Sequence, residues 1–241
     1  MSSYNTLAEF YDLLTDNVDY KVRSDYISGF FSKYGKSSGK LLDLACGTGT
    51  LSKLLSDKGY EVTGIDLSDE MLSLADNKCA GKVKFLKGDI SNFSLDEKFD
   101  FCLCSLDSIN HLNDYDDVKS CFSSVYQCLN SGGIFVFDVN TLYKHEFILG
   151  DNTFAFDEED FFLCWDNEYE GGGRVRILLD FFVFNGENYD RFSEEFYETA
   201  YDTEDLIEAL SDFEIIGIYD VLKYTEPADD SQRIYFVCKR K

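Results

Sequence analysis

The chain has 241 residues, of which 44% are hydrophobic, enough for one sizeable core with an added subdomain. Its net charge of −24 repels a polyanion over most of the surface, so DNA and bulk RNA are disfavoured as partners. No apolar run approaches the ~20 residues that span a bilayer, and the N-terminus lacks the features of a secretory signal. The sequence therefore predicts a cytoplasmic protein with neither a membrane nor a nucleic-acid partner, and leaves its oligomeric state open.

The cysteines are expected to be free thiols, and no metal site is expected. Cys102, Cys104 and Cys238 lie in apolar strand-like runs, where cysteine acts as a small core residue. No Cys-x-x-Cys pair occurs, and His111 and His145 stand apart in the sequence. Zinc sites normally combine such ligands at short spacings, which this chain does not provide.

Short apolar runs alternate with helical patterns between residues 40 and 140. Strands are predicted at Lys40–Leu44, Glu61–Asp66, 83–86, Phe99–Cys104 and 134–139. Apolar residues at helical spacing lie between them, with Ser68 as the cap of one helix and residues 131–133 as the end of another. Alternation of this kind predicts an α/β fold with parallel strands and right-handed crossovers.

The pattern changes after residue 150. Strands are predicted at 154–156, 161–165 and 175–184, with Asn185-Gly186 as a strong hairpin signal. Helical spacing returns from Asp202, and strands at 214–221 and 233–239 close the chain. The chain is thus divided into one domain of residues 1–149 and 201–241 and an antiparallel β insertion at residues 150–200.

Three groups of residues fall beyond the carboxyl ends of the predicted parallel strands, where α/β sheets bind ligands. The turn Ala45-Cys46-Gly47-Thr48-Gly49 lets the backbone approach a ligand closely and leads into a helix N-terminus. Asp66 suits a ribose diol, and Asp89 suits an adenine amino group. Together they favour a nucleoside ligand.

Two phosphate-binding motifs are the alternatives to this interpretation. The dinucleotide fingerprint G-x-G-x-x-G lacks its third glycine here, because Ser52 stands in its place. The P-loop needs Gly-Lys-Ser/Thr, which Gly49-Thr50-Leu51 does not supply. The expected nucleoside therefore carries no pyrophosphate.

Motifs between residues 40 and 140 carry a family resemblance. Asp43-Leu44-Ala45-Cys46-Gly47-Thr48-Gly49 is similar to the motif E/D-x-G-x-G-x-G, with Ala45 replacing the first glycine, and residues 62–68 and 88–90 fit the acidic second and third strands. The chain resembles class I S-adenosylmethionine-dependent methyltransferases. With residues 10–13, residues 108–112 and the insertion, it resembles bacterial small-molecule members, including amino-sugar N-methyltransferases. The resemblance implies a Rossmann-like, doubly wound, mostly parallel sheet with an antiparallel last strand.

The resemblance also implies roles for residues in binding S-adenosylmethionine. Asp66 would bind the ribose hydroxyls, with Leu67 and Met71 beside the adenine. Asp89 would accept a hydrogen bond from the adenine amino group, and Ile90 would contact the ring. The other implied contacts are Ala45, Cys46, Gly47, Thr48 and Gly49 of the turn, Cys104 and Ser105 after the fourth strand, and Tyr4 and Tyr11, which would close over the cofactor.

Methyl transfer is an in-line displacement, in which the protein mainly positions the acceptor lone pair. A base is needed only if the acceptor loses a proton, and His111 is the best candidate, followed by Tyr11. Residues 105–108 do not form the Asn/Asp-Pro-Pro-Tyr motif of amino-directed DNA enzymes, and no Pro-Cys occurs. The sequence thus favours a small-molecule acceptor methylated on nitrogen or oxygen. The alternatives are a non-catalytic nucleoside-binding regulatory module and a nicotinamide-dependent oxidoreductase.

Overall fold

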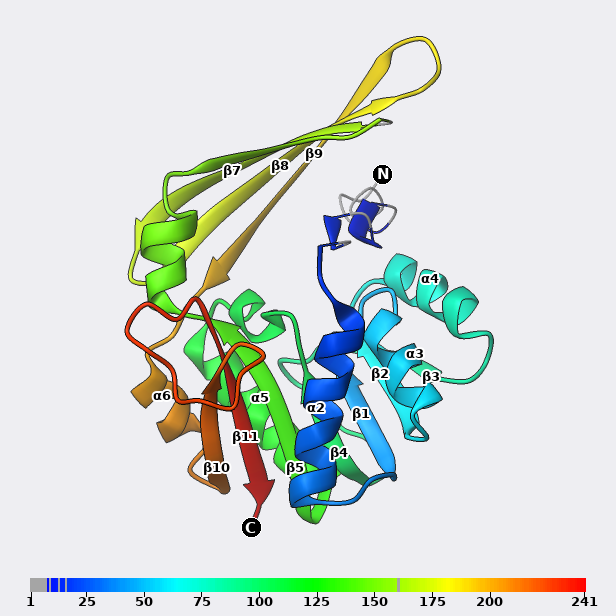
Figure 1. Cartoon of the computed structure of the whole chain (residues 1–241), viewed down its shortest axis with the longest axis vertical. Coiled ribbons are helices and arrows are strands. Elements are labelled where there is room, and N and C mark those ends of the chain that lie inside the picture. The colour runs from blue at the N-terminus through cyan, green and yellow to red at the C-terminus, as the bar shows by residue number, and fades with distance from the viewer. Residues whose placement is uncertain (1–7, 9, 13, 16, 160) are drawn as a thin grey trace.

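The computed structural model describes residues 8, 10–12, 14, 15, 17–159 and 161–241 (Figure 1). Seven strands of this described chain form the main sheet, in the order β10-β11-β5-β4-β1-β2-β3. They are β1 (Lys40–Leu44), β2 (Glu61–Asp66), β3 (Lys84–Lys87), β4 (Phe99–Cys104), β5 (Leu129–Asn140), β10 (Phe213–Asp220) and β11 (Arg233–Arg240). Strands β1 to β5 pair in parallel, and β11 runs antiparallel to both β5 and β10. The Rossmann-like sheet with an antiparallel last strand is confirmed.

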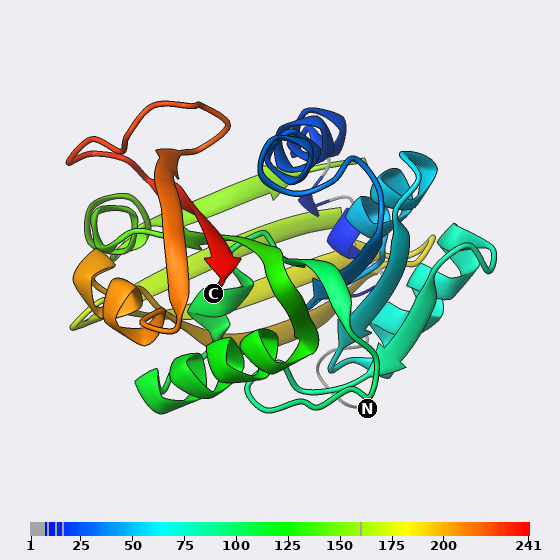
Figure 2. The ribbon, with the colours of Figure 1, turned by 90° about the horizontal axis from the view of Figure 1, so that it is seen from below.

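Helices cover both faces of the main sheet (Figure 2). On one face lie α2 (Tyr20–Tyr34), α3 (Thr50–Asp57) and α4 (Asp69–Cys79), and on the other α5 (Tyr115–Cys128) and α6 (Thr203–Ala209). Each face has its own apolar core: Phe30 and Phe31 of α2 are fully buried on one side, and Phe122 of α5 packs on Phe137 on the other. The fold is therefore doubly wound, as predicted.

Side-chain caps mark the start of α2, α4 and α5. Ser68 accepts a hydrogen bond from the Met71 amide at 3.1 Å and caps α4 as predicted. The junction of α5 and β5 differs from the prediction. The helix ends at Cys128 and the strand begins at Leu129, which pairs with Phe99, so residues 131–133 lie inside the irregular start of β5 rather than at a helix end.

A second sheet stands above the carboxyl edge of the main sheet (Figure 1). Its strands are β6 (Thr153–Asp157), β7 (Phe161–Gly171), β8 (Arg174–Phe184) and β9 (Tyr189–Thr199), paired antiparallel in that order. The sequence did not predict β9, nor the helical turn η2 (Lys144–Leu149) that leads into the sheet.

The buried face of the second sheet packs on the N-terminal segment. The ring of Phe10 lies 5.4 Å from that of Phe161 in β7 and 5.6 Å from that of Phe181 in β8, measured between centroids. Leu14 packs on the same cluster of side chains. The N-terminal segment therefore depends on the second sheet for its position.

Candidate functional site

The Gly-rich loop, residues 45–49, joins β1 to α3 in a left-handed path. Ala45, Gly47 and Gly49 have φ values of 52°, 53° and 75°. A Cβ on Gly49 would lie 2.9 Å from the Cβ of Ala75, so this glycine permits close packing of α4. At Gly47 the nearest atom would be Cε1 of Tyr11 at 3.7 Å, which leaves the backbone there open to a ligand. Ala45, at the position where the motif usually has glycine, adopts a conformation unfavourable for a residue with a Cβ.

Asp66 ends β2 and is fixed against the Gly-rich loop. Its Oδ2 accepts a hydrogen bond from the Gly47 amide at 2.8 Å, and its Oδ1 accepts one from the Ser68 amide at 3.0 Å. A carboxylate has about four acceptor positions, so both oxygens can accept further hydrogen bonds. Beside Asp66, Leu67 is 59% exposed, whereas Met71 is buried. The pair of oxygens is thus available for a diol.

Asp89 and Ile90 follow β3. Asp89 is exposed, and its Oδ1 accepts a hydrogen bond from the Ser91 amide at 2.8 Å. Ile90 is buried in the core on the α5 side. Asp89 therefore has a defined local turn and a surface that a ligand can reach.

Tyr11 lies over the Gly-rich loop, whereas Tyr4 lies outside the described residues. A pocket is lined by Tyr11 together with Tyr20, Asp43, Ala45, Cys46, Thr48, Thr50, Leu51, Ser105 and Leu106. Burial, and then the negative charges of Asp107 and Asp66, raise the pKa of Tyr11, so its hydroxyl stays protonated at neutral pH. Burial likewise raises the pKa of Cys46, which agrees with a small turn residue rather than a nucleophile.

A polar latch ties the N-terminal segment to the loop. Lys78, from α4, places Nζ 2.7 Å from Oδ2 of Asp12 and 2.8 Å from Oγ1 of Thr48. Thr48 in turn donates to Oδ1 of Asp12 at 2.6 Å. These contacts hold Tyr11 over the pocket, because Asp12 is its neighbour in the chain.

The far wall of the pocket is the turn that follows β4. Cys104 is buried in the core on the α5 side and does not line the pocket, and the Ser105 hydroxyl donates to Oδ1 of Asp138 at 2.7 Å. Leu106 and Asp107 follow with φ values of 59° and 53°. Asp138, on β5, accepts a hydrogen bond from the Leu106 amide of this turn. Arg233, at the start of β11, donates in turn to Asp138.

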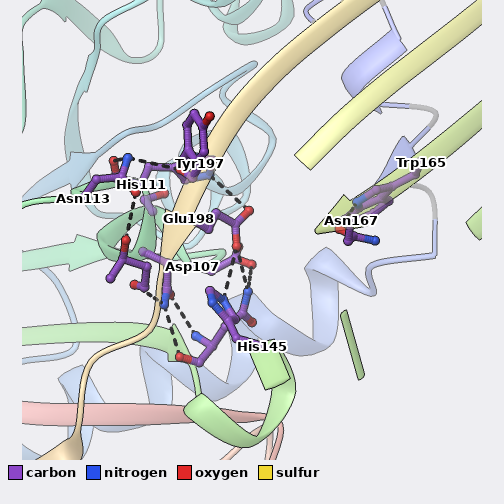
Figure 3. A network of polar contacts seen from close by, with 12 residues as sticks. Asp107, His111, Asn113, His145, Trp165, Asn167, Tyr197 and Glu198 are labelled. Atoms are coloured by element: carbon purple, nitrogen blue, oxygen red, sulfur yellow. Dashed lines mark hydrogen bonds and ion pairs between the residues drawn. The ribbon is translucent and has the colours of Figure 1, made fainter. Parts of the chain in front are cut away.

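His111 belongs to a histidine–glutamate cluster with His145 and Glu198 (Figure 3). The Nε2 atoms of His111 and His145 lie 3.8 Å and 3.6 Å from the carboxylate oxygens of Glu198. Nδ1 of His145 lies 2.7 Å from the Gly173 carbonyl oxygen and must carry a proton there, because a carbonyl only accepts. His111 is 48% exposed and His145 is fully buried, so of the two only His111 can meet an acceptor.

Two asparagines hold His111 in this position. Asn113 donates to the carbonyl oxygens of His111 and Tyr197, each at 3.2 Å, and thereby joins η1 (Ser108–His111) to β9. Asn110 donates to the Thr199 carbonyl oxygen at 3.1 Å. The histidine is therefore carried by a rigid turn rather than by a free loop.

Two buried carboxylates of the site have opposite pKa shifts. Burial raises the pKa of Asp43 to about 7; the hydroxyl of Ser52, which donates to it, opposes the rise. Burial also disfavours the charge on Glu198, but the imidazole of His145 and the positive charges around it outweigh burial, and its pKa lies below the ordinary value. Glu198 is thus held ionised, and Asp43 is partly protonated near neutral pH.

The predicted site residues therefore fall into two groups. One group lines or adjoins a single pocket: Tyr11, Ala45, Cys46, Thr48 and Ser105 line it, and Asp66 is fixed to the Gly-rich loop beside it. The predicted residues Leu67, Met71, Asp89, Ile90 and Cys104 do not belong to its lining. His111 lies in the neighbouring cluster with Glu198, which sequence reasoning missed, as it missed Asp138 and Arg233. Their signal lies in contacts between distant segments, which no local pattern contains. Within the described residues, no group of three or more His, Cys, Asp or Glu side chains is arranged to hold a metal ion.

The residues present fit an adenosine cofactor of the predicted kind. The open backbone at Gly47 and the two oxygens of Asp66, each with spare acceptor capacity, provide a surface and a diol acceptor at the carboxyl edge of the sheet.

In the part of the chain that is described, no helix has the length and apolar character needed to cross a membrane. All eight cysteines are free thiols.

Known proteins similar to this chain identify its family. The family described as "Methyltransferase domain" matches residues 41–133. The putative methyltransferase YqeM of Bacillus subtilis (strain 168) is 35% identical over 244 residues, covering 98% of this chain and 97% of that protein. The crystal structure of an S-adenosylmethionine-dependent methyltransferase from Clostridium acetobutylicum ATCC 824 is 37% identical, covers 99% of each chain and superposes with a TM-score of 0.88.

A more distant relative is the dTDP-3-amino-3,6-dideoxy-alpha-D-glucopyranose N,N-dimethyltransferase of Streptomyces fradiae, 33% identical over 108 residues, which cover 44% of this chain and 42% of that protein. These likenesses decide between a methyltransferase and the two alternatives left open by the sequence, the regulatory module and the oxidoreductase. With relatives matched over nearly its whole length, the chain belongs to the S-adenosylmethionine-dependent methyltransferases, and it is an enzyme that uses S-adenosylmethionine.

Proposed function

We propose that this methyltransferase acts on a small-molecule acceptor, at a nitrogen or oxygen atom, bound between the carboxyl edge of the main sheet and the second sheet. The observation that carries the proposal is the position of His111, half-exposed beside the buried, ionised Glu198 (Figure 3). The net charge of −24 supports the expectation that nucleic acid is not the acceptor. The distant sugar-amine relative is compatible with such an acceptor.

The proposed cofactor contacts extend from the pocket to residues outside its lining, at the ends of β2 and β3. The oxygens of Asp66 accept from the ribose hydroxyls, and Leu67 and Met71 flank the adenine, whose amino group donates to Asp89. Ala45 and Gly47 lie under the methionine part, and Tyr11 covers it from the N-terminal segment. When bound, S-adenosylmethionine supplies a methyl group that its positive sulfur already activates.

His111 is the proposed base. With its Nε2 toward the Glu198 carboxylate, a proton on Nε2 is favoured, and the lone pair of the neutral ring then lies on Nδ1. The Nδ1 atom of His111 would then take up the proton that a nitrogen or oxygen acceptor loses when it is methylated. Tyr11 stays protonated because burial raises its pKa, so it can orient the acceptor as a donor but cannot act as the base.

We also propose that residues 150–200 form the wall of the acceptor site. The support is that β9 contributes Glu198 and that η1, which carries His111, is tied to β9. Replacing the whole insertion by a short linker is a poor test, because Phe10 packs on β7 and β8 and would lose its support.

The free thiols agree with the cytoplasmic location predicted from the sequence.

A labelling screen tests the acceptor class. The purified enzyme is incubated with methyl-labelled S-adenosylmethionine and with separated metabolite, protein and nucleic-acid fractions of a bacterial extract. We expect label in the metabolite fraction, with mass spectrometry identifying the methylated nitrogen or oxygen. Label confined to protein or nucleic acid would contradict the proposal.

Once an acceptor is identified, His111→Gln tests the base. We expect kcat to fall by about 10²-fold, while the dissociation constant of S-adenosylhomocysteine stays unchanged. If kcat is unchanged across the pH range, His111 is not the base, and positioning alone accounts for the rate.

A further inference from the structure

The turn after β4 has an unusual backbone. Leu106 and Asp107 both have positive φ, at 59° and 53°, although both carry a Cβ. Consecutive residues in this conformation are unfavourable unless surrounding contacts hold them. This turn contributes Ser105 and Leu106 to the lining of the cofactor pocket, opposite Tyr11 and Cys46.

Asp138 supplies the contacts that hold the turn. Its side chain is fully buried on β5. Oδ1 accepts from the Ser105 hydroxyl at 2.7 Å and from the Leu106 amide at 2.9 Å, and Oδ2 accepts from the Asp107 amide at 3.2 Å. One carboxylate therefore binds three successive residues of the turn.

Arg233 completes the arrangement from the first residue of β11. Its two terminal nitrogens lie 2.7 Å from Oδ2 of Asp138 and 2.8 Å from Oδ2 of Asp107, so one guanidinium joins the carboxylate to the turn itself. Asp107 also accepts from Asn140, whose Nδ2 lies 3.3 Å from Oε2 of Glu198. The same contacts thus reach the histidine–glutamate cluster.

We propose that Asp138 and Arg233 are positioning residues, which hold residues 105–107 in the left-handed turn and thereby set the affinity of the pocket for the cofactor. The inference rests on the proposed cofactor placement. Neither side chain lines the pocket within the described chain; each acts through the turn. The charge and fork geometry of arginine matter, since a lysine cannot bridge two carboxylates with parallel N–H groups.

Three variants test the inference by calorimetric titration with S-adenosylhomocysteine. Asp138→Asn should raise the dissociation constant about tenfold, because one acceptor becomes a donor facing the turn amide or Arg233. Arg233→Lys should raise it several-fold. Arg240→Lys, at the other end of β11, is the matched control and should stay within about twofold, since this arginine contacts the Leu129 carbonyl and the ring of Tyr126 and makes no hydrogen bond to Asp138 or to residues 105–107 within the described chain.

Hydrogen exchange without ligand separates positioning from general stability. The amides of Leu106 and Asp107 should exchange faster in Asp138→Asn and Arg233→Lys, while the core of β4 keeps its protection. Adding Leu106→Gly to Asp138→Asn should restore part of the affinity, because glycine adopts this conformation without strain. A purely structural role of Asp138 would not be rescued in this way.

The outcomes are distinct. Unchanged affinity and unchanged exchange in Asp138→Asn overturn the inference. Faster exchange with unchanged affinity also overturns it, provided that Asp66→Ala weakens binding, since the cofactor placement then stands. If Asp66→Ala and Asp138→Asn both leave affinity unchanged, the proposed placement fails and the inference fails with it.

Discussion

Asp43 and Glu198 are both buried carboxylates, one on the proposed cofactor side and one on the proposed acceptor side of the site, and their pKa shifts have opposite signs. Asp43 has a hydroxyl donor and the like charge of Asp66 near it, so burial dominates. Glu198 has the hydrogen-bonding imidazole of His145 and the charge of Lys144 near it, so attraction outweighs burial. The comparison shows that burial alone does not fix the charge of a carboxylate; the neighbours within a few ångströms decide it.

The largest expected effect concerns Asp43. Its pKa is about 7 in the folded chain against an ordinary 3.8, so its contribution to stability is full below pH 3.8 and is lost as the pH rises through about 7. The free energy of unfolding of the cofactor-free protein should fall by ~3 kcal/mol between about pH 4 and pH 8 from this group. Asp43→Asn should abolish that decrease, measured by urea denaturation at several pH values.

Asp69→Asn, at an exposed carboxylate in the first turn of α4, is the control and should keep the decrease. A wild-type protein whose stability does not fall over this pH range would show that Asp43 is ionised in the fold, and would remove the contrast with Glu198.

Asp66 gives the next largest effect, on cofactor affinity. Asp66→Ala should weaken the binding of S-adenosylhomocysteine by about 2–3 kcal/mol, because it loses charge-assisted hydrogen bonds to the ribose and releases the Gly47 amide. Calorimetry measures the loss, and circular dichroism checks the fold. An unchanged dissociation constant would make Asp66 a structural strand end and move the cofactor elsewhere.

Glu198 should show the opposite pH dependence to Asp43. Since its pKa is lowered in the fold, its contribution to stability is present above its ordinary 4.5 and is lost as the pH falls below that value. Glu198→Gln should therefore lose about 2 kcal/mol at neutral pH and much less in acid. Equal losses at both pH values would mean that shape, not charge, is what Glu198 contributes.

The smallest effect is expected at the latch between α4 and the N-terminal segment. The Lys78–Asp12 pair is partly exposed, at 23% and 49% of the side chains, so Lys78→Met should cost only about 0.5–1 kcal/mol of cofactor affinity, and less in high salt. The measurement is the dissociation rate of S-adenosylhomocysteine at low and high salt. Lys82→Met removes a comparable exposed pair with Asp57 far from Tyr11 and should leave the rate unchanged.

The two sides of the site also differ in how far the sequence predicts them. Residues 43–49 and 66–68 are short segments in which a carboxylate lies at the end of a strand or glycines follow it, so periodicity and composition place them on one edge. Glu198 lies on β9, whose first half is exposed and highly charged. The local sequence therefore predicts an exposed acidic residue, and the burial of Glu198 follows only once β9 is paired with β8. Its burial depends on His145 and Asn140, contributed by distant segments.

Contacts between distant segments also explain why the start of β5 was predicted wrongly and why the turn η2 was missed. Residues 131–133 have the composition of a helix end, yet pairing of Leu129 with β4 extends the strand through them. The prediction of residues 150–200 as an antiparallel unit follows from alternation and Asn185-Gly186, which are local signals, whereas the contact of Phe10 with β7 and β8 is not.

The position of β11 has a consequence for folding during synthesis. A ribosome releases the chain from its N-terminus, so β1 to β5 and the Gly-rich loop emerge before β11. Until β11 inserts between β10 and β5, the edge of β5 is unpaired and Asp138 lacks the guanidinium of Arg233. A nascent chain that has exposed every motif of the cofactor site would therefore still present an unfixed turn after β4, and competence to bind the methyl donor would come only with the last strand.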